Sequence, residues 1–204
     1  MSTNILLNML KHITLVTKHR WLVFKFSCKL GIPFRGLMHD LSKFSYDEFW
    51  ESVKYYNGKV SPISMCKKDK GYSKAWLHHK GRNKHHVQYW VDLGTKGVAP
   101  VIPYKYAAEI ICDKLSASKT YNGKNWTTSS EYEYWQKEVT RIIINPKMQN
   151  FFTEVFIQVK DNGIDKTLTK KNIKSLYQKY CIDDKTEYVY EFHGEWKKAD
   201  ESKK

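Results

Sequence analysis

The stretch Leu37-Met-His-Asp-Leu-Ser-Lys-Phe-Ser45 sets a histidine beside an aspartate, His39 and Asp40, in a segment that we predict to begin as a short helix over 36–41. Neutral imidazole is a ligand for Zn, Fe, Ni and Cu, and a carboxylate beside it widens the choice toward Mn. A His-Asp pair also arises by chance, so its meaning depends on the histidines and acids elsewhere in the chain.

A second stretch, Ala75-Trp-Leu-His-His-Lys-Gly-Arg-Asn-Lys-His-His-Val-Gln-Tyr-Trp90, holds two His-His pairs. We predict one helix over 72–90, in which His79 and His86 are seven residues apart and share a face with Asn83. These two histidines are therefore the predicted metal ligands of this stretch.

The neighbouring stripe of the same predicted helix carries His78, Arg82 and His85. Only one of the two stripes can face a metal cluster. We therefore expect His85 to lie at the edge of the metal site, where it and Arg82 would hold a substrate phosphate. The alternative is ordinary. A lone helical histidine is more often a surface or core residue than a ligand, and the four histidines could instead form a contact face for nucleic acid.

Two long helices are expected to carry further ligand-type residues. An amphipathic pattern predicts a helix over 4–30 whose buried face includes His19. Another apolar stripe predicts a helix over 104–118 that carries Asp113. Glu109 shares the face of Asp113, either as a carboxylate that orients a histidine or as a surface acid.

Turn and capping signals divide the rest of the chain. Ser45 and Glu48 form a predicted capping box for a helix to about residue 56, whereas the lysine-rich segment 59–71 is predicted to be a loop. Alternation over 187–192 predicts a short strand or an extended arm, followed by a disordered charged tail from residue 197. Three further helices are expected, at 129–144, 147–160 and 169–180.

Composition supports a folded, all-α protein. Hydrophobic residues make up 41% of the chain and aromatic residues 15%, which is enough for a core without disulfides. We expect a helical metal-binding domain over 1–160 and a C-terminal helix with a charged tail over 161–204.

The charge of the chain is strongly positive and unevenly spread. Of the net +14, half lies within 59–86, where eight Lys and Arg face a single acid, Asp69. A field of this sign attracts anionic partners, such as nucleotides, phosphorylated metabolites or nucleic acid. The same charge also serves as a solubilising surface.

Several classes of protein are excluded. No run approaches the roughly 18 apolar residues of a membrane span, so no membrane partner is expected. The first ten residues lack the basic start and the cleavage site of a secretory signal, and the four cysteines show no CxxC spacing. We therefore expect a cytoplasmic protein with reduced cysteines.

The order of the ligand-type residues resembles the histidine-aspartate (HD) superfamily of metal-dependent phosphohydrolases. Its pattern is a histidine on an early helix, an adjacent His-Asp pair and a later aspartate; members with two extra histidines bind two metals. The resemblance implies one or two divalent ions (Mn, Fe or Zn) and places Lys43, within an HDxxK form, near the substrate phosphate. The implied metal ligands are His19, His39, Asp40, His79, His86 and Asp113.

More closely, the chain resembles an uncharacterised family of small bacterial and phage proteins, over about residues 10–125. The resemblance is carried by segments 18–25, 35–45, 75–90 and the stretch from Pro103 to Asp113. This family implies no activity, so the expected function comes from the broader superfamily.

That superfamily implies a phosphohydrolase or phosphodiesterase acting on a nucleotide or cyclic nucleotide. Asp40 would bridge the metals, while Lys43 and Arg82 would stabilise the charge that develops on the phosphate. Two alternatives stay open: a di-iron oxygenase on the same scaffold, and a nucleic-acid- or protein-binding module with a structural or vestigial metal. The chain contains no GxSxG, P-loop, GxGxxG or HExxH motif that would offer competing chemistry.

Overall fold

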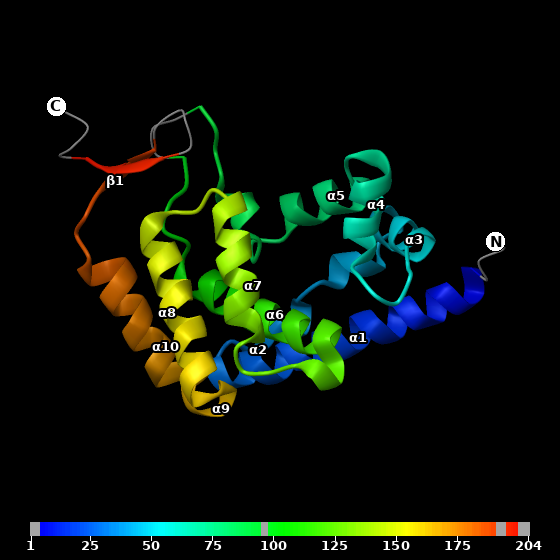
Figure 1. Ribbon diagram of the computed structural model, residues 1–204, viewed down its shortest axis with the longest axis horizontal. Helices are drawn as coiled ribbons and strands as arrows, with labels where there is room; N and C mark the ends of the chain where they lie inside the picture. The colour runs from blue at the N-terminus through cyan, green and yellow to red at the C-terminus, as the bar shows by residue number, and fades with distance from the viewer. Residues whose placement is uncertain (1–4, 95–97, 191–194, 200–204) are drawn as a thin grey trace.

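The computed structural model describes residues 5–94, 98–190 and 195–199, and it confirms the all-helical fold class (Figure 1). Helix α1 (Ile5–Leu30) runs along one side of the molecule, and its N-terminal turns extend beyond the other helices. Its buried positions recur at three- and four-residue steps and include Val16, His19 and Val23, which confirms the predicted burial of the His19 face. None of the described helices is long and apolar enough to cross a membrane.

The segments that carry the ligand-type residues gather around α1. Helix α2 (Pro33–Met38) packs against α1 and leads into the 3-10 turn η1 (Leu41–Phe44). Helix α3 (Tyr46–Lys54) contacts both α1 and α5 (Lys74–Arg82). The long helix α6 (Tyr104–Asn122) packs along α1 and supplies Asp113 to the same region.

The predicted loop over 59–71 is wrong, because it contains a helix, α4 (Pro62–Lys70). Pro62 occupies the first turn, where its missing N–H costs no hydrogen bond. Gly71 ends the helix with a φ of +80°, which glycine adopts without steric penalty. Lys67, Lys68 and Lys70 of this segment therefore lie on a helix rather than in an extended loop.

The predicted single helix over 72–90 is also wrong, because α5 ends at Arg82. Asn83 has an extended backbone, and its side-chain amide donates to the carbonyl of His79 at 2.8 Å. The chain turns there and resumes as a 3-10 turn, η2 (Val87–Trp90). The two His-His pairs are consequently not on one helix.

The hydrophobic core lies where α1 and α6 meet the C-terminal helices. Buried residues from both sides of position 160 belong to one cluster, including Leu115, Trp135, Phe152 and Ile173. The predicted C-terminal extension from 161 therefore packs onto the same core as the preceding helices. The elements after α6 are η3 (Gly123–Asn125), α7 (Ser130–Glu138), η4 (Val139–Arg141), α8 (Pro146–Asn162), α9 (Ile164–Thr167), α10 (Lys170–Tyr177) and the π-helical turn η5 (Gln178–Asp183).

A small hairpin follows the helices. Strand β1 (Tyr188–Tyr190) pairs antiparallel with β2 (Trp196–Lys198), so the first of the two alternatives predicted for 187–192, a short strand, is confirmed over 188–190; residues 191–192 lie outside the described part. The tail predicted to be disordered from residue 197 is instead paired up to residue 199, because the amide of Ala199 donates to the carbonyl of Glu187. Residues 200–204 of that predicted tail lie outside the described part.

Candidate metal centre

His39 and Asp40 lie in a tight turn between α2 and η1. Asp40 has a φ of +55°, and among the described residues it is the one non-glycine with a positive φ. Aspartate tolerates this left-handed conformation better than most residues, but it still stores strain. Arg20 of α1 holds the turn, since Nε donates to the carbonyl of His39 and Nη2 to that of Leu37, both at 2.8 Å. The side chains of the His-Asp pair are thereby kept buried.

Three ligand-type residues from separate segments, His19, His39 and Asp113, lie together on one side of Asp40. Nε2 of His19 lies 3.1 Å from Oδ1 of Asp113 and 3.4 Å from Nε2 of His39. The second oxygen of Asp40, Oδ2, lies 3.4 Å from Nε2 of His39 and 3.7 Å from Nε2 of His19. We call His19, His39 and Asp113 the first ligand group.

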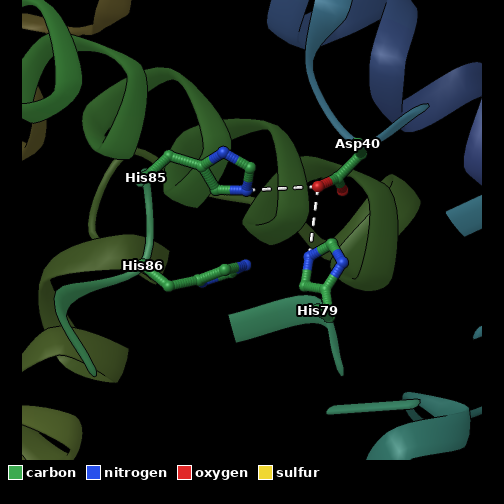
Figure 2. A group of neighbouring side chains, drawn as sticks. All are labelled: Asp40, His79, His85 and His86. Carbon is green, nitrogen blue, oxygen red and sulfur yellow. Dashed lines mark ion pairs between the residues drawn. The ribbon is translucent and has the colours of Figure 1, made fainter. Parts of the chain in front are cut away.

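The other oxygen of Asp40, Oδ1, faces a second ligand group formed by His79, His85 and His86 (Figure 2). Nε2 of His79 lies 3.2 Å from this oxygen and Nε2 of His85 lies 3.1 Å from it. The ring of His86 points into the space between the other two. Ligand atoms of these histidines and Asp40 all lie within 4.8 Å of one another. The Asp40 carboxylate thus stands between two groups.

The second ligand group fits a cation because its nitrogens lack other partners. Nε2 of His79, His85 and His86 and Oδ1 of Asp40 are all buried, and apart from the approach of His79 and His85 to Oδ1 none of the four has a polar partner. Each such atom costs about 1–3 kcal/mol, and folded proteins rarely leave several together. A divalent ion bound at their centre would satisfy all four lone pairs. These residues, and those of the first ligand group, could therefore hold metal.

Glu109 of α6 contacts one histidine of each ligand group, at the ring nitrogen that does not face Asp40. Its Oε1 lies 3.1 Å from Nδ1 of His39 and 3.1 Å from Nδ1 of His85. Burial would raise the pKa of Glu109, but these imidazoles lower it to about 2, so the group is a carboxylate. An Nδ1–H donated to a carboxylate leaves Nε2 free to bind a metal. Of the two interpretations left open by the sequence, the geometry matches a histidine-orienting carboxylate.

Glu48 of α3 has the equivalent contact with His79. Its Oε2 lies 2.6 Å from Nδ1 of His79, and its Oε1 lies 2.7 Å from Nδ1 of His78. The predicted capping box is wrong, because the side chain of Ser45 makes no capping hydrogen bond and Glu48 is turned toward the imidazoles instead. The sequence carried no signal for this role, since a capping acid and an orienting acid occupy the same position.

The charges of the centre are set by burial and close pairing. Burial alone would raise the pKa of Asp40, but His39 and Lys43 hold it well below its usual value. Burial lowers the pKa of His19, and it lowers that of His86 strongly. These two histidines are therefore neutral near pH 7, which is the form that binds metal ions.

Comparison with known proteins now identifies the family. Residues 8–158, most of the chain, match the model of a family described as a family of unknown function (DUF5662). The chain belongs to this family. Both ligand groups lie within the matched segment, as do Asp40, Glu48 and Glu109. No curated protein and no solved structure matches this DUF5662 chain.

The three residues that the sequence predicted to bind substrate in the DUF5662 protein, His85, Lys43 and Arg82, do not lie together at one site edge. His85, predicted at the edge of the metal site, is 2% exposed and belongs to the second ligand group. It arrives there because α5 ends before it, so that His85 and His86 no longer obey helical spacing. Nζ of Lys43 lies 2.5 Å from Oδ2 of Asp40, beside the centre. Arg82 is exposed at the end of α5.

A cavity of about 440 Å³ opens beside the centre, and three ligand residues line it: His85, His86 and Asp113. Other parts of its wall come from α6 and α7, and Lys59 stands at its edge before α4. Sites for small ligands typically have volumes of about 300–1,000 Å³. The DUF5662 protein therefore has a ligand-sized space in direct contact with its candidate metal centre.

Proposed function

We propose that this protein is a metal-dependent phosphohydrolase or phosphodiesterase of the HD type, acting on a nucleotide or cyclic nucleotide. The observation that carries the proposal is the position of Asp40, whose two oxygens face two separate ligand groups. A carboxylate shared in this way is typical of two-metal centres, whose ions lie about 3.5–4 Å apart. The HD-type motif order in the sequence supports the same assignment.

The first ligand group would hold one ion and the second ligand group the other, with Asp40 between them. A set of imidazoles and a carboxylate suits Fe, Zn or Mn rather than Mg or Ca. When bound, two such ions activate a water molecule for in-line attack on phosphorus and offset the charge of the phosphate. Glu109 and Glu48 favour the tautomers that leave Nε2 of His39, His85 and His79 available.

Lys43, beside Asp40, is the residue that we propose binds the phosphate. Burial alone would lower the pKa of its ammonium, but the Asp40 carboxylate raises it above the usual value, so Lys43 stays charged. Its side chain is 27% exposed and so remains accessible to a ligand. A fixed positive charge here stabilises the negative charge that develops on the phosphate oxygens during hydrolysis. Lys59 at the cavity edge adds to the attraction of an anionic substrate.

The test is an activity screen with untagged protein loaded with Mn, Fe or Zn. Nucleoside mono- and triphosphates, cyclic mono- and dinucleotides and bis(p-nitrophenyl) phosphate would be offered with each metal. Metal-stimulated release of phosphate or p-nitrophenol, lost by at least about 100-fold in Asp40→Asn, is the expected result. Silence across the panel with metal bound would overturn the proposal. Oxygen consumption by the iron form would instead indicate the di-iron oxygenase.

The net +7 of segment 59–86 favours a second candidate, a nucleic-acid-binding module with a structural metal. Part of this charge lies on α4, as Lys67, Lys68 and Lys70. Binding through phosphate contacts weakens steeply as salt rises. Salt-dependent binding of an oligonucleotide without turnover, unchanged when Asp40 is replaced, would support this candidate over the hydrolase.

A further inference from the structure

The cavity beside the metal centre has a second wall that the proposed chemistry does not use. Helix α6 runs along it, and Asp113, Ala117 and Tyr121 line it at four-residue steps, with Ser118 alongside. Helix α7 closes the other side with Glu131 and residues that follow it. The cavity thus extends from the metal ligands to a wall with a different chemical character.

Two buried polar groups at this wall, Glu131 and Ser118, lie near each other, since the Ser118 hydroxyl lowers the pKa of Glu131, but they lack any other partner. Glu131 is 2% exposed, and its Oε1 makes no hydrogen bond. Ser118 is 8% exposed, and its Oγ also makes none. Buried polar atoms in folded proteins are nearly always paired, so two unpaired ones lining a single cavity indicate that a ligand completes their hydrogen bonds. Neither residue belongs to the two ligand groups or contacts them in any described hydrogen bond.

The rest of this wall is suited to a flat, uncharged ring. Tyr134, one turn after Glu131 on α7, contributes aromatic surface to it, and Trp76 of α5 lines the same cavity beside His86. Lys114 carries a charge, but it is already paired with Glu138. Aromatic side chains stack on nucleobases of any kind, at about 1–3 kcal/mol per base. Because Lys114 is paired with Glu138, this wall is less suited to a second phosphate than to a base.

We propose that this end of the cavity binds the base of a nucleotide substrate, and that Glu131, with Ser118, is the specificity-determining group that hydrogen-bonds its edge. The proposal rests on the proposed hydrolase function, because the phosphate of the same molecule would lie at the metal centre. Asp113 and Ser118 are five residues apart on α6, about 7.5 Å along the helix axis. A ribose joining phosphate and base spans a comparable length.

The protonation state of Glu131 narrows the kind of base. Burial raises the pKa of Glu131 to about 8, although Lys114 opposes the rise, so the carboxyl is mostly neutral at pH 7. A neutral carboxyl donates one hydrogen bond through its O–H and accepts another through its carbonyl. It therefore matches an edge with a ring nitrogen next to an amino group, as adenine presents.

The experiment measures binding, so that it does not depend on turnover. Full-length, Mn-loaded protein would be titrated by calorimetry with two probes: the 5′-methylenephosphonate analogue of AMP, which cannot be hydrolysed at phosphorus, and the same ribose phosphonate without a base. Wild type is compared with Glu131→Leu, which removes both hydrogen-bonding atoms, and with Glu131→Gln, which keeps a donor and an acceptor. Ser118→Ala serves as an independent variant should Glu131→Leu fail to fold.

We expect wild type and Glu131→Gln to bind the adenine-bearing probe at least about ten-fold more tightly than the abasic one, a difference of about 1.4 kcal/mol. Glu131→Leu should lose this preference while its affinity for the abasic probe is unchanged, and Ser118→Ala should lose part of it. Equal affinity of wild type for both probes, no binding of either, or an equal loss for both probes in Glu131→Leu would overturn the proposal. Base-dependent binding, with no turnover of any compound in the activity screen, would refute the hydrolase and leave the base site standing.

Discussion

Nε2 of His85 lies 3.1 Å from Oδ1 of Asp40, the oxygen that does not face the first ligand group. This contact decides which histidines form the second ligand group. Because α5 ends at Arg82, His85 and His86 both turn inward, whereas His78 stays on the helix with a side chain that is 20% exposed and bound to Glu48. Which of the four histidines face Asp40 is therefore decided by where α5 ends, and not by helical periodicity.

His85→Ala should therefore lose metal, and His78→Ala should keep it. Removing one of three imidazoles leaves an incomplete ligand set, so the metal bound per chain should fall by about one ion in His85→Ala. Elemental analysis of the two variants and wild type, purified without a chelator or a histidine tag, measures this. Full metal content in His85→Ala would show that His85 is not a ligand and would favour the substrate-binding role expected from a continuous helix.

Asp40→Asn should lower the occupancy of both metals, because each carboxylate oxygen faces one ligand group. An amide keeps the shape of the side chain but offers one neutral oxygen and an NH₂ in place of two anionic oxygens. Titration with Mn or Zn, followed by elemental analysis, should show both affinities reduced by at least about ten-fold. Asp161→Asn, at an exposed residue of α8, is the matched control and should bind as wild type does. An unchanged second metal in Asp40→Asn would show that the carboxylate is not shared.

Glu48→Gln and Glu109→Gln should differ in how many metals they weaken. Glu48 contacts a histidine of the second ligand group alone, while Glu109 contacts one histidine of each. Loss of an orienting carboxylate typically costs 10–100-fold in metal affinity. A two-site metal titration should therefore show one weakened site in Glu48→Gln and two in Glu109→Gln. The same pattern in both variants would contradict the separate assignment of the two carboxylates.

Sequence patterns were sufficient where the signal is local. The periodicity of α1 predicted the burial of His19, and Thr169 caps α10 as expected, its hydroxyl accepting from the amide of Asn172. The residue types of the metal centre were visible because a His-Asp pair and two His-His pairs are concentrated in two short stretches. The inward position of His85 was not visible, since it depends on a helix end set by Asn83, whose side chain competes for the carbonyl of His79.

Long-range packing hid the remaining features. Glu48 follows Ser45 at capping-box spacing, so nothing local shows that it reaches His79 on another helix. Glu131 alternates with Glu133 in a segment rich in acids, and the two have the same local context. Only the packing of α7 against α6 and α8 makes Glu131 buried and Glu133 exposed.

The last prediction uses this difference between Glu131 and Glu133. Burial raises the pKa of Glu131 to about 8, from the ordinary value of 4.5 that the carboxyl has in the unfolded chain. The folded state therefore holds the proton more tightly, so the stability contributed by the neutral carboxyl is present below about pH 4.5 and is lost as the pH rises through about 8. Glu131→Gln cannot ionise, so its free energy of unfolding relative to wild type should increase between pH 5 and pH 9, by on the order of 2–4 kcal/mol. Denaturant unfolding at several pH values, with equal metal content, measures this difference, and Glu133→Gln on the same helix should show no such divergence. Parallel curves for Glu131→Gln and wild type would mean that Glu131 is ionised in the folded protein, and the base edge expected at the cavity wall would then have to offer two donors.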